Sequence, residues 1–180
     1  MVAGVGITAN DILAWHDFFG IVAQVGATLA GLIFVGLTIS LPHILKADGY
    51  LSRAFAALFV QLELLAIGVI GLIPYQHPIF LGAQFIGIGL ALSGAILVFS
   101  RNFREDENSS VLGSRRLRII RGGVTALATL SPVASGALLI AGFQYALYFI
   151  VPGVLAASYL SIGYAWVFAV EIPRRMDRKL

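Results

Sequence analysis

The chain has 180 residues, of which 59% are hydrophobic and 12% are charged, and its formal net charge is +3. It contains five apolar stretches of about 20 residues or more, each long enough to cross a hydrocarbon layer about 30 Å thick, so the composition indicates a polytopic membrane protein. The longest polar connection, about 18 residues, is too short for a soluble catalytic or nucleic-acid-binding domain. The lack of cysteine excludes disulfides and thiolate chemistry.

We expect an all-α fold, a membrane bundle of five helices that forms a single transmembrane domain. Each span is apolar on nearly every side, which favours helices in lipid over surface helices or barrel strands. In chain order the predicted spans are Trp15 to Leu41, Leu51 to Ile73, Ile79 to Phe99, Ile119 to Gly142 and Pro152 to Ile172. Before the first span, Thr8 or Asn10 is placed to cap the helix, and Asp11 suits the positive end of its dipole.

The first span combines a mildly polar stripe with a ladder of small residues. The stripe consists of Gln24, Thr28, Gly31, Val35 and Thr38, and it has the spacing needed to line a narrow aqueous path. The ladder consists of Ala23, Ala27 and Gly31, and the third span repeats it with Ala83, Gly87 and Ala91. Small residues at this spacing let two backbones approach closely, so we prefer helix packing to pore lining for both spans.

The second span carries Glu63 near its middle, where inserting an acidic residue costs about 2.5 to 3.5 kcal/mol. Arg53 lies ten residues earlier, about 15 Å along the helix axis and about 80° around it, and no other span carries a cation in its interior. We therefore expect Glu63 to be either protonated at neutral pH or exposed to water. Gln61 points about 200° away around the helix, so the two residues cannot share a face and one of them is expected to meet a different helix or a neighbouring subunit. Hydroxyl partners for Glu63 at similar depth are Thr28, Thr129, Ser131, Ser135, Ser158 and Tyr159.

The fourth span contains Pro132 near its middle, which predicts a bend and a backbone carbonyl without its helical partner. Ser131 or Ser135 is placed to bind that carbonyl. The loop before this span, about residues 101–118, mixes acids, arginines and serines, which predicts a mobile, solvated segment. Four arginines in or beside this loop either hold the loop on one side or contact lipid headgroups; they are Arg115, Arg116, Arg118 and Arg121.

The basic residues predict the orientation of the chain in the membrane. All twelve fall beside the first loop, beside the third loop or in the tail, whereas the N-terminus and the second and fourth connections have none. This alternation predicts an outside N-terminus and a cytoplasmic C-terminus. The positive net charge follows from this topology, so we do not expect nucleic-acid binding.

No stretch carries the signature of an enzyme or a cofactor site. The sequence has no HExxH, GxSxG or Walker motif and no cluster of metal ligands, so we expect no catalytic, cofactor-binding or metal-binding residues. His16 and Asp17 are adjacent, but adjacent helical residues diverge by about 100° and do not face one another. We interpret them as interfacial anchors.

Several segments share their order and character with one group of proteins. They are "AWHDFFGIVAQVGATLAGLIFVGLTISL", "RAFAAL", "PYQ", the central proline of the fourth span, "YFIVPGVL" and "AWVFAVEIPRR". Together, over about residues 12 to 175, they resemble a widespread family of uncharacterised bacterial inner-membrane proteins, some of which are automatically labelled modulator of FtsH protease. The resemblance implies a multi-pass protein of the bacterial cytoplasmic membrane and supplies no functional residues.

Two functions of different kinds follow from these features. The first is a non-enzymatic scaffold or modulator within a membrane complex, which binds partner helices and copies of itself through its small-residue faces. The second is a small homo-oligomeric ion channel or proton-linked carrier that uses Glu63. We prefer the scaffold because each polar feature also has a packing explanation.

Overall fold

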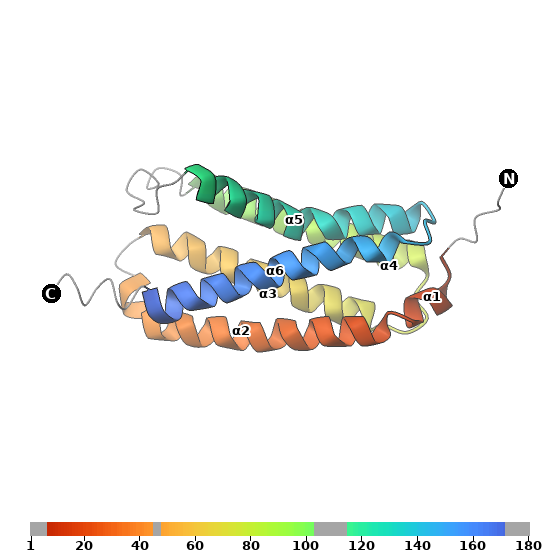
Figure 1. The fold of residues 1–180 in the computed structure, drawn as a ribbon, viewed down its shortest axis with the longest axis horizontal. Coiled ribbons are helices and arrows are strands. Elements are labelled where there is room, and N and C mark those ends of the chain that lie inside the picture. Colours follow the sequence, from red (N-terminus) through yellow and green to blue (C-terminus); the bar gives the residue numbers. More distant parts are fainter. Residues whose placement is uncertain (1–6, 45–47, 103–114, 172–180) are drawn as a thin grey trace.

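The computed structural model describes residues 7–44, 48–102 and 115–171, and these form a bundle of long helices (Figure 1). In chain order the elements are α1 (Ala9–Leu13), α2 (His16–Ile44), α3 (Asp48–Gly71), α4 (Pro78–Asn102), α5 (Arg115–Ile140), the 3₁₀ turn η2 (Ala146–Phe149), α6 (Ile150–Trp166) and the π-helical turn η3 (Val167–Glu171). Five helical segments in this part of the chain are long and apolar enough to cross a membrane. The prediction of an all-α protein with five such helices is confirmed.

The helices run up and down side by side, so that α2, α4 and α6 begin at the end of the bundle next to α1, here called the α1 end (Figure 1). The closest pairs are α4 with α5 and α2 with α3, and α6 packs against α5, α2 and α3. Half of the most apolar stretch of α3 is enclosed, against 22% for α2. α3 is therefore the central helix of the bundle, and α2 is its most peripheral one.

The chain enters the bundle through a short separate helix. Thr8 caps α1, and its side chain accepts a hydrogen bond from the backbone N–H of Asp11 at 3.4 Å. The Asp11 carboxylate accepts hydrogen bonds from the Thr8 backbone N–H and hydroxyl, both at 2.7 Å. The predicted cap is thus present, but it starts α1 rather than the first span, which begins separately at His16.

The last span is assembled from three pieces, because the 3₁₀ turn η2 leads into α6 and the π-helical turn η3 follows it. Its long apolar stretch runs from Ala146 to Val170. The buried hydroxyl of Ser40 on α2 donates a hydrogen bond to the carbonyl of Phe168 in η3. This contact fastens the far end of α6 to α2.

Glycines set the distance between the closest helix pairs. A Cβ atom built on Gly136 of α5 would lie 2.4 Å from the carbonyl oxygen of Gly82 on α4, and one on Gly82 would lie 2.6 Å from the carbonyl of Gly136. A Cβ on Gly68 of α3 would lie 2.4 Å from the backbone nitrogen of Ala23 on α2. Backbone touches backbone at these points, which is the close approach that small residues permit in membrane helices.

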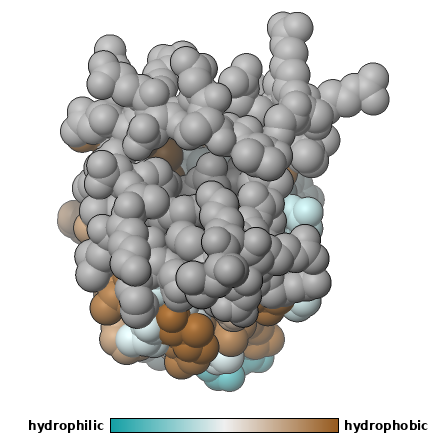
Figure 2. Space-filling model, turned by 90° about the vertical axis from the view of Figure 1, so that its left-hand side faces the viewer, coloured by the Kyte–Doolittle hydropathy of each residue, from teal (hydrophilic) through white to brown (hydrophobic). Residues whose placement is uncertain are grey.

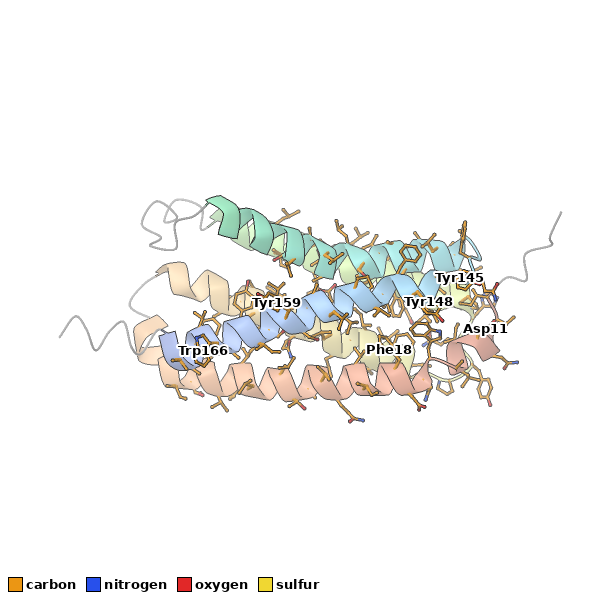
Figure 3. The ribbon with its side chains drawn as sticks, viewed as in Figure 1. Asp11, Phe18, Tyr145, Tyr148, Tyr159 and Trp166 are labelled. Atoms are coloured by element: carbon orange, nitrogen blue, oxygen red, sulfur yellow. The ribbon has the colours of Figure 1, made fainter. Side chains whose placement is uncertain are left out.

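The outer surface is largely apolar, as a lipid-facing surface requires. In the end-on view, the coloured lower edge on the α2 side is mostly brown, broken by paler and teal atoms (Figure 2). Aromatic rings gather at the α1 end, where Trp15 contacts Phe18 and Tyr148 with ring centroids 5.3 and 4.8 Å apart (Figure 3). Trp166 lies toward the opposite end (Figure 3). This placement is typical of aromatic residues at the two membrane interfaces.

Candidate functional site

Glu63 lies on the central helix α3 and is almost completely enclosed by the chain, with 1% of its surface exposed. Neither carboxyl oxygen makes a hydrogen bond within the described part of the chain. The expected alternative of a water-exposed side chain therefore does not hold for the single chain. An unsatisfied buried polar group costs about 1 to 3 kcal/mol, so Glu63 is a liability for stability and a candidate for function.

Four of the six hydroxyl groups that were expected to serve Glu63 donate to backbone carbonyls instead; they are those of Thr28, Thr129, Ser131 and Ser135. Thr28 donates to the carbonyl of Gln24 at 2.8 Å, and Thr129 donates to the carbonyl of Thr125 at 3.2 Å. The side chain of Tyr159 is exposed on the surface of α6 (Figure 3). The expectation of a hydrogen bond from one of these groups to Glu63 is wrong, because hydroxyls on helices find carbonyl partners in their own or a neighbouring helix.

Gln61 joins three helices at the centre of the bundle. Its side-chain amide donates a hydrogen bond to the carbonyl of Gly26 on α2 at 2.8 Å, and its amide oxygen accepts one from Ser161 on α6 at 2.5 Å. Gln61 and Ser161 are both buried. One of the pair Glu63 and Gln61 was expected to meet another helix, and Gln61 does so. Ser161 is absent from the sequence-based candidates, although its position inside an apolar span marked it as a hydrogen-bonding residue.

Pro132 lies fully buried in the middle of α5, whose ribbon bends near its centre (Figure 1). The neighbouring serines do not bind the carbonyl that this proline frees, contrary to our expectation. Ser131 instead donates to the carbonyl of Phe149 and accepts a hydrogen bond from the backbone N–H of Gly153 at 3.2 Å. Ser135 donates to the carbonyl of Ala146 at 2.9 Å. Both hydroxyls tie α5 to the start of the last span.

The polar stripe of α2 faces away from the bundle, because all five of its residues are exposed; they are Gln24, Thr28, Gly31, Val35 and Thr38. The stripe therefore lines no path through the single chain. Of the ladder in α2, Ala23 packs against α3, whereas Ala27 and Gly31 point outward. The ladder of α4, which consists of Ala83, Gly87 and Ala91, is exposed throughout. Apart from Ala23, the ladder residues therefore do not form packing surfaces inside the chain.

The predicted lipid-headgroup residues Arg115, Arg116, Arg118 and Arg121 belong to the first turns of α5, and their side chains fall outside the described part of the structure. Most of the predicted mobile loop, residues 103–114, also lies outside it. His16 lies at the start of α2, where its Nε2 donates a hydrogen bond to the carbonyl of Leu72, 2.8 Å away and just beyond the end of α3. Within residues 7–44, 48–102 and 115–171, no three metal-ligating side chains gather at one point.

The site thus consists of one enclosed acid on α3, one amide that bridges three helices, and a polar stripe on the outside of α2. Comparison with known proteins gives no match to a family model, to a curated protein or to a solved structure.

Proposed function

We propose that the chain is a non-enzymatic integral membrane protein that acts as a scaffold or modulator within a membrane complex and associates with copies of itself. The observation that carries this proposal is the outward direction of the polar and small residues of α2. In lipid, an exposed amide gains a partner and a small-residue face gains close packing only when another helix covers them. The interior of the bundle already has its own close contacts through Gly82, Gly136 and Gly68.

The basic residues of the sequence support an outside N-terminus and a cytoplasmic C-terminus, and the family resemblance supports the bacterial cytoplasmic membrane. In this orientation the α1 end faces outward. Accessibility labelling of single cysteines placed at the two ends of the chain tests this arrangement. We expect labelling of the two ends from opposite sides of the membrane, whereas labelling from the same side would overturn the topology.

Native mass spectrometry of the protein released from lipid nanodiscs tests self-association. We expect a dimer or a larger assembly, and we expect proteoliposomes that contain it to be silent to protons, alkali cations and halides. A protein that is monomeric over the whole accessible concentration range, and that copurifies with no membrane partner, would refute the scaffold.

One observation favours a second function, a small homo-oligomeric ion channel or proton-linked carrier. Glu63 is enclosed on the central helix with both carboxyl oxygens unpartnered in the described residues, and such acids in membrane proteins commonly mark ion or proton pathways. Flux from liposomes carrying the wild type or Glu63→Gln separates the two functions. Flux that the substitution abolishes would establish the channel or carrier and remove the scaffold, whereas silence of both proteins would remove the channel.

A further inference from the structure

The side chain of Gln24 is the most demanding polar group on the outer surface of α2. It lies about 7 Å along the helix axis from the middle of the span His16–Leu41, and so well inside a hydrocarbon layer about 30 Å thick. The residue is exposed, and among the described residues its side-chain amide makes no hydrogen bond. Thr28 and Thr38 on the same face differ, because their hydroxyls donate to carbonyls of α2 itself at 2.8 Å.

The surroundings of Gln24 allow a second helix to come close. Ala27 and Gly31 follow it on the same face, both exposed, and a Cβ atom built on Gly31 meets nothing within 4 Å. Of the five spans, α2 is also the least enclosed by the rest of the chain. The face defined by Gln24, Ala27, Thr28 and Gly31, here called the Gln24 face, therefore combines an amide that lacks a partner with room for a backbone beside it.

We propose that the Gln24 face is the surface through which two copies of this chain form a two-fold symmetric dimer; this rests on the proposed function, in which the chain self-associates. Copies inserted in the same direction and related by an axis along the membrane normal hold their Gln24 residues at the same depth. An amide is both donor and acceptor, so the two can exchange reciprocal hydrogen bonds. A second copy therefore offers an amide at the same depth in the membrane as Gln24, with both the donor and the acceptor that the Gln24 amide needs.

Cysteine crosslinking in the membrane tests this interface directly, because the chain contains no cysteine of its own. Disulfides form only when two Cα atoms lie about 4.4 to 6.8 Å apart, a distance that a close helix pair reaches at its small residues. We expect Gly31→Cys to form disulfide-linked dimers under mild oxidation. Leu32→Cys is the control on the same helix, because Leu32 is also exposed but lies about 100° around the helix axis from Gly31.

The second measurement is the dimerisation constant in liposomes, followed by energy transfer between labelled copies as lipid dilutes them. We expect Gln24→Leu to weaken dimerisation about tenfold, the equivalent of two interhelical hydrogen bonds, and Gln24→Asn to restore part of the loss. Gln84→Leu is the matched control, since Gln84 is an exposed amide in the outward face of α4. It should leave the constant unchanged.

The outcomes separate this inference from the proposed function. If the protein is oligomeric but Gly31→Cys does not crosslink, while Gly87→Cys on α4 does, the Gln24 face is refuted and self-association stands. If Gly31→Cys crosslinks only when mixed with Gly87→Cys, the contact runs from α2 to α4 and the two-fold dimer is refuted. If the wild type does not associate at any lipid dilution and copurifies with no membrane partner, both the inference and the scaffold fail.

Discussion

Replacing Gln61 with leucine should destabilise the bundle by about 1 to 2 kcal/mol. The substitution replaces the amide with an apolar side chain of similar volume and removes two interhelical hydrogen bonds, one to the Gly26 carbonyl and one from the Ser161 hydroxyl. In membrane proteins such bonds average about 0.6 kcal/mol each and reach about 1.7 kcal/mol. Neither partner is orphaned, because the single proton of the Ser161 hydroxyl can turn to the carbonyl of Ala157, which lies 2.8 Å away, and the Gly26 carbonyl lies within a continuous helix. The cost should therefore lie in the lower part of the range.

The free energy of unfolding can be measured in bicelles by steric trapping, at protein concentrations that keep the chain monomeric. Gln84→Leu makes the same chemical change at an exposed position and should alter stability by less than about 0.5 kcal/mol. A double-mutant cycle with Ser161→Ala should give a coupling energy near 0.6 kcal/mol. A loss below about 0.3 kcal/mol for Gln61→Leu would show that the amide does not fasten the helices. A loss above about 4 kcal/mol would show that the Ser161 hydroxyl and the Gly26 carbonyl are left without hydrogen bonds when the amide is removed.

Three further perturbations probe other parts of the bundle. Glu63→Leu should raise the unfolding free energy by about 1 kcal/mol, because it removes two unsatisfied polar atoms, and a loss of stability in the same assay would reveal a partner for the carboxyl. Gly136→Ala should cost about 1 to 3 kcal/mol through its clash with a backbone carbonyl, whereas Gly87→Ala meets open space and should cost less than about 0.5 kcal/mol; equal effects would contradict the glycine contact. The hydrogen bonds from Thr8 lower the pKa of Asp11, so their contribution to α1 is complete above the ordinary pKa of a carboxyl and is lost as the pH falls through the lowered value. Thr8→Ala should move that pKa back up in an NMR titration, and an unmoved pKa would contradict the capping contact.

The number and type of the helices follow from the sequence because each span is long and apolar, and that property needs no knowledge of the neighbours. Which side of a helix turns inward does not follow in the same way. In α4, Gly82 meets the backbone of α5 whereas Gly87 faces outward, although both look equally suited to close packing. In a soluble protein the polar face of a helix would show which side turns outward. These spans are apolar on nearly every side, so the periodicity of apolar residues does not distinguish the inward side from the outward side.

In the candidate site, too, some contacts could be predicted from the sequence and others could not. The bridging role of Gln61 was predictable in outline, because a buried amide in lipid needs a partner on another helix. Ser131 and Ser135 were expected to serve the carbonyl freed by Pro132, yet they bind carbonyls at the start of the last span. Their partners depend on where the 3₁₀ turn η2 places its carbonyls, and that is a property of the packed bundle rather than of α5 alone.

The bond between Gln61 and Ser161 has a consequence for how the protein is made. Its two residues are 100 positions apart, so at roughly 5 to 20 residues per second the ribosome supplies Ser161 about 5 to 20 s after Gln61. The donor contact to Gly26 is different, because that residue is translated 35 positions earlier than Gln61. The first two spans of the nascent chain can therefore pack against each other early. The amide oxygen of Gln61 has no hydrogen bond from Ser161 until the last span has been inserted.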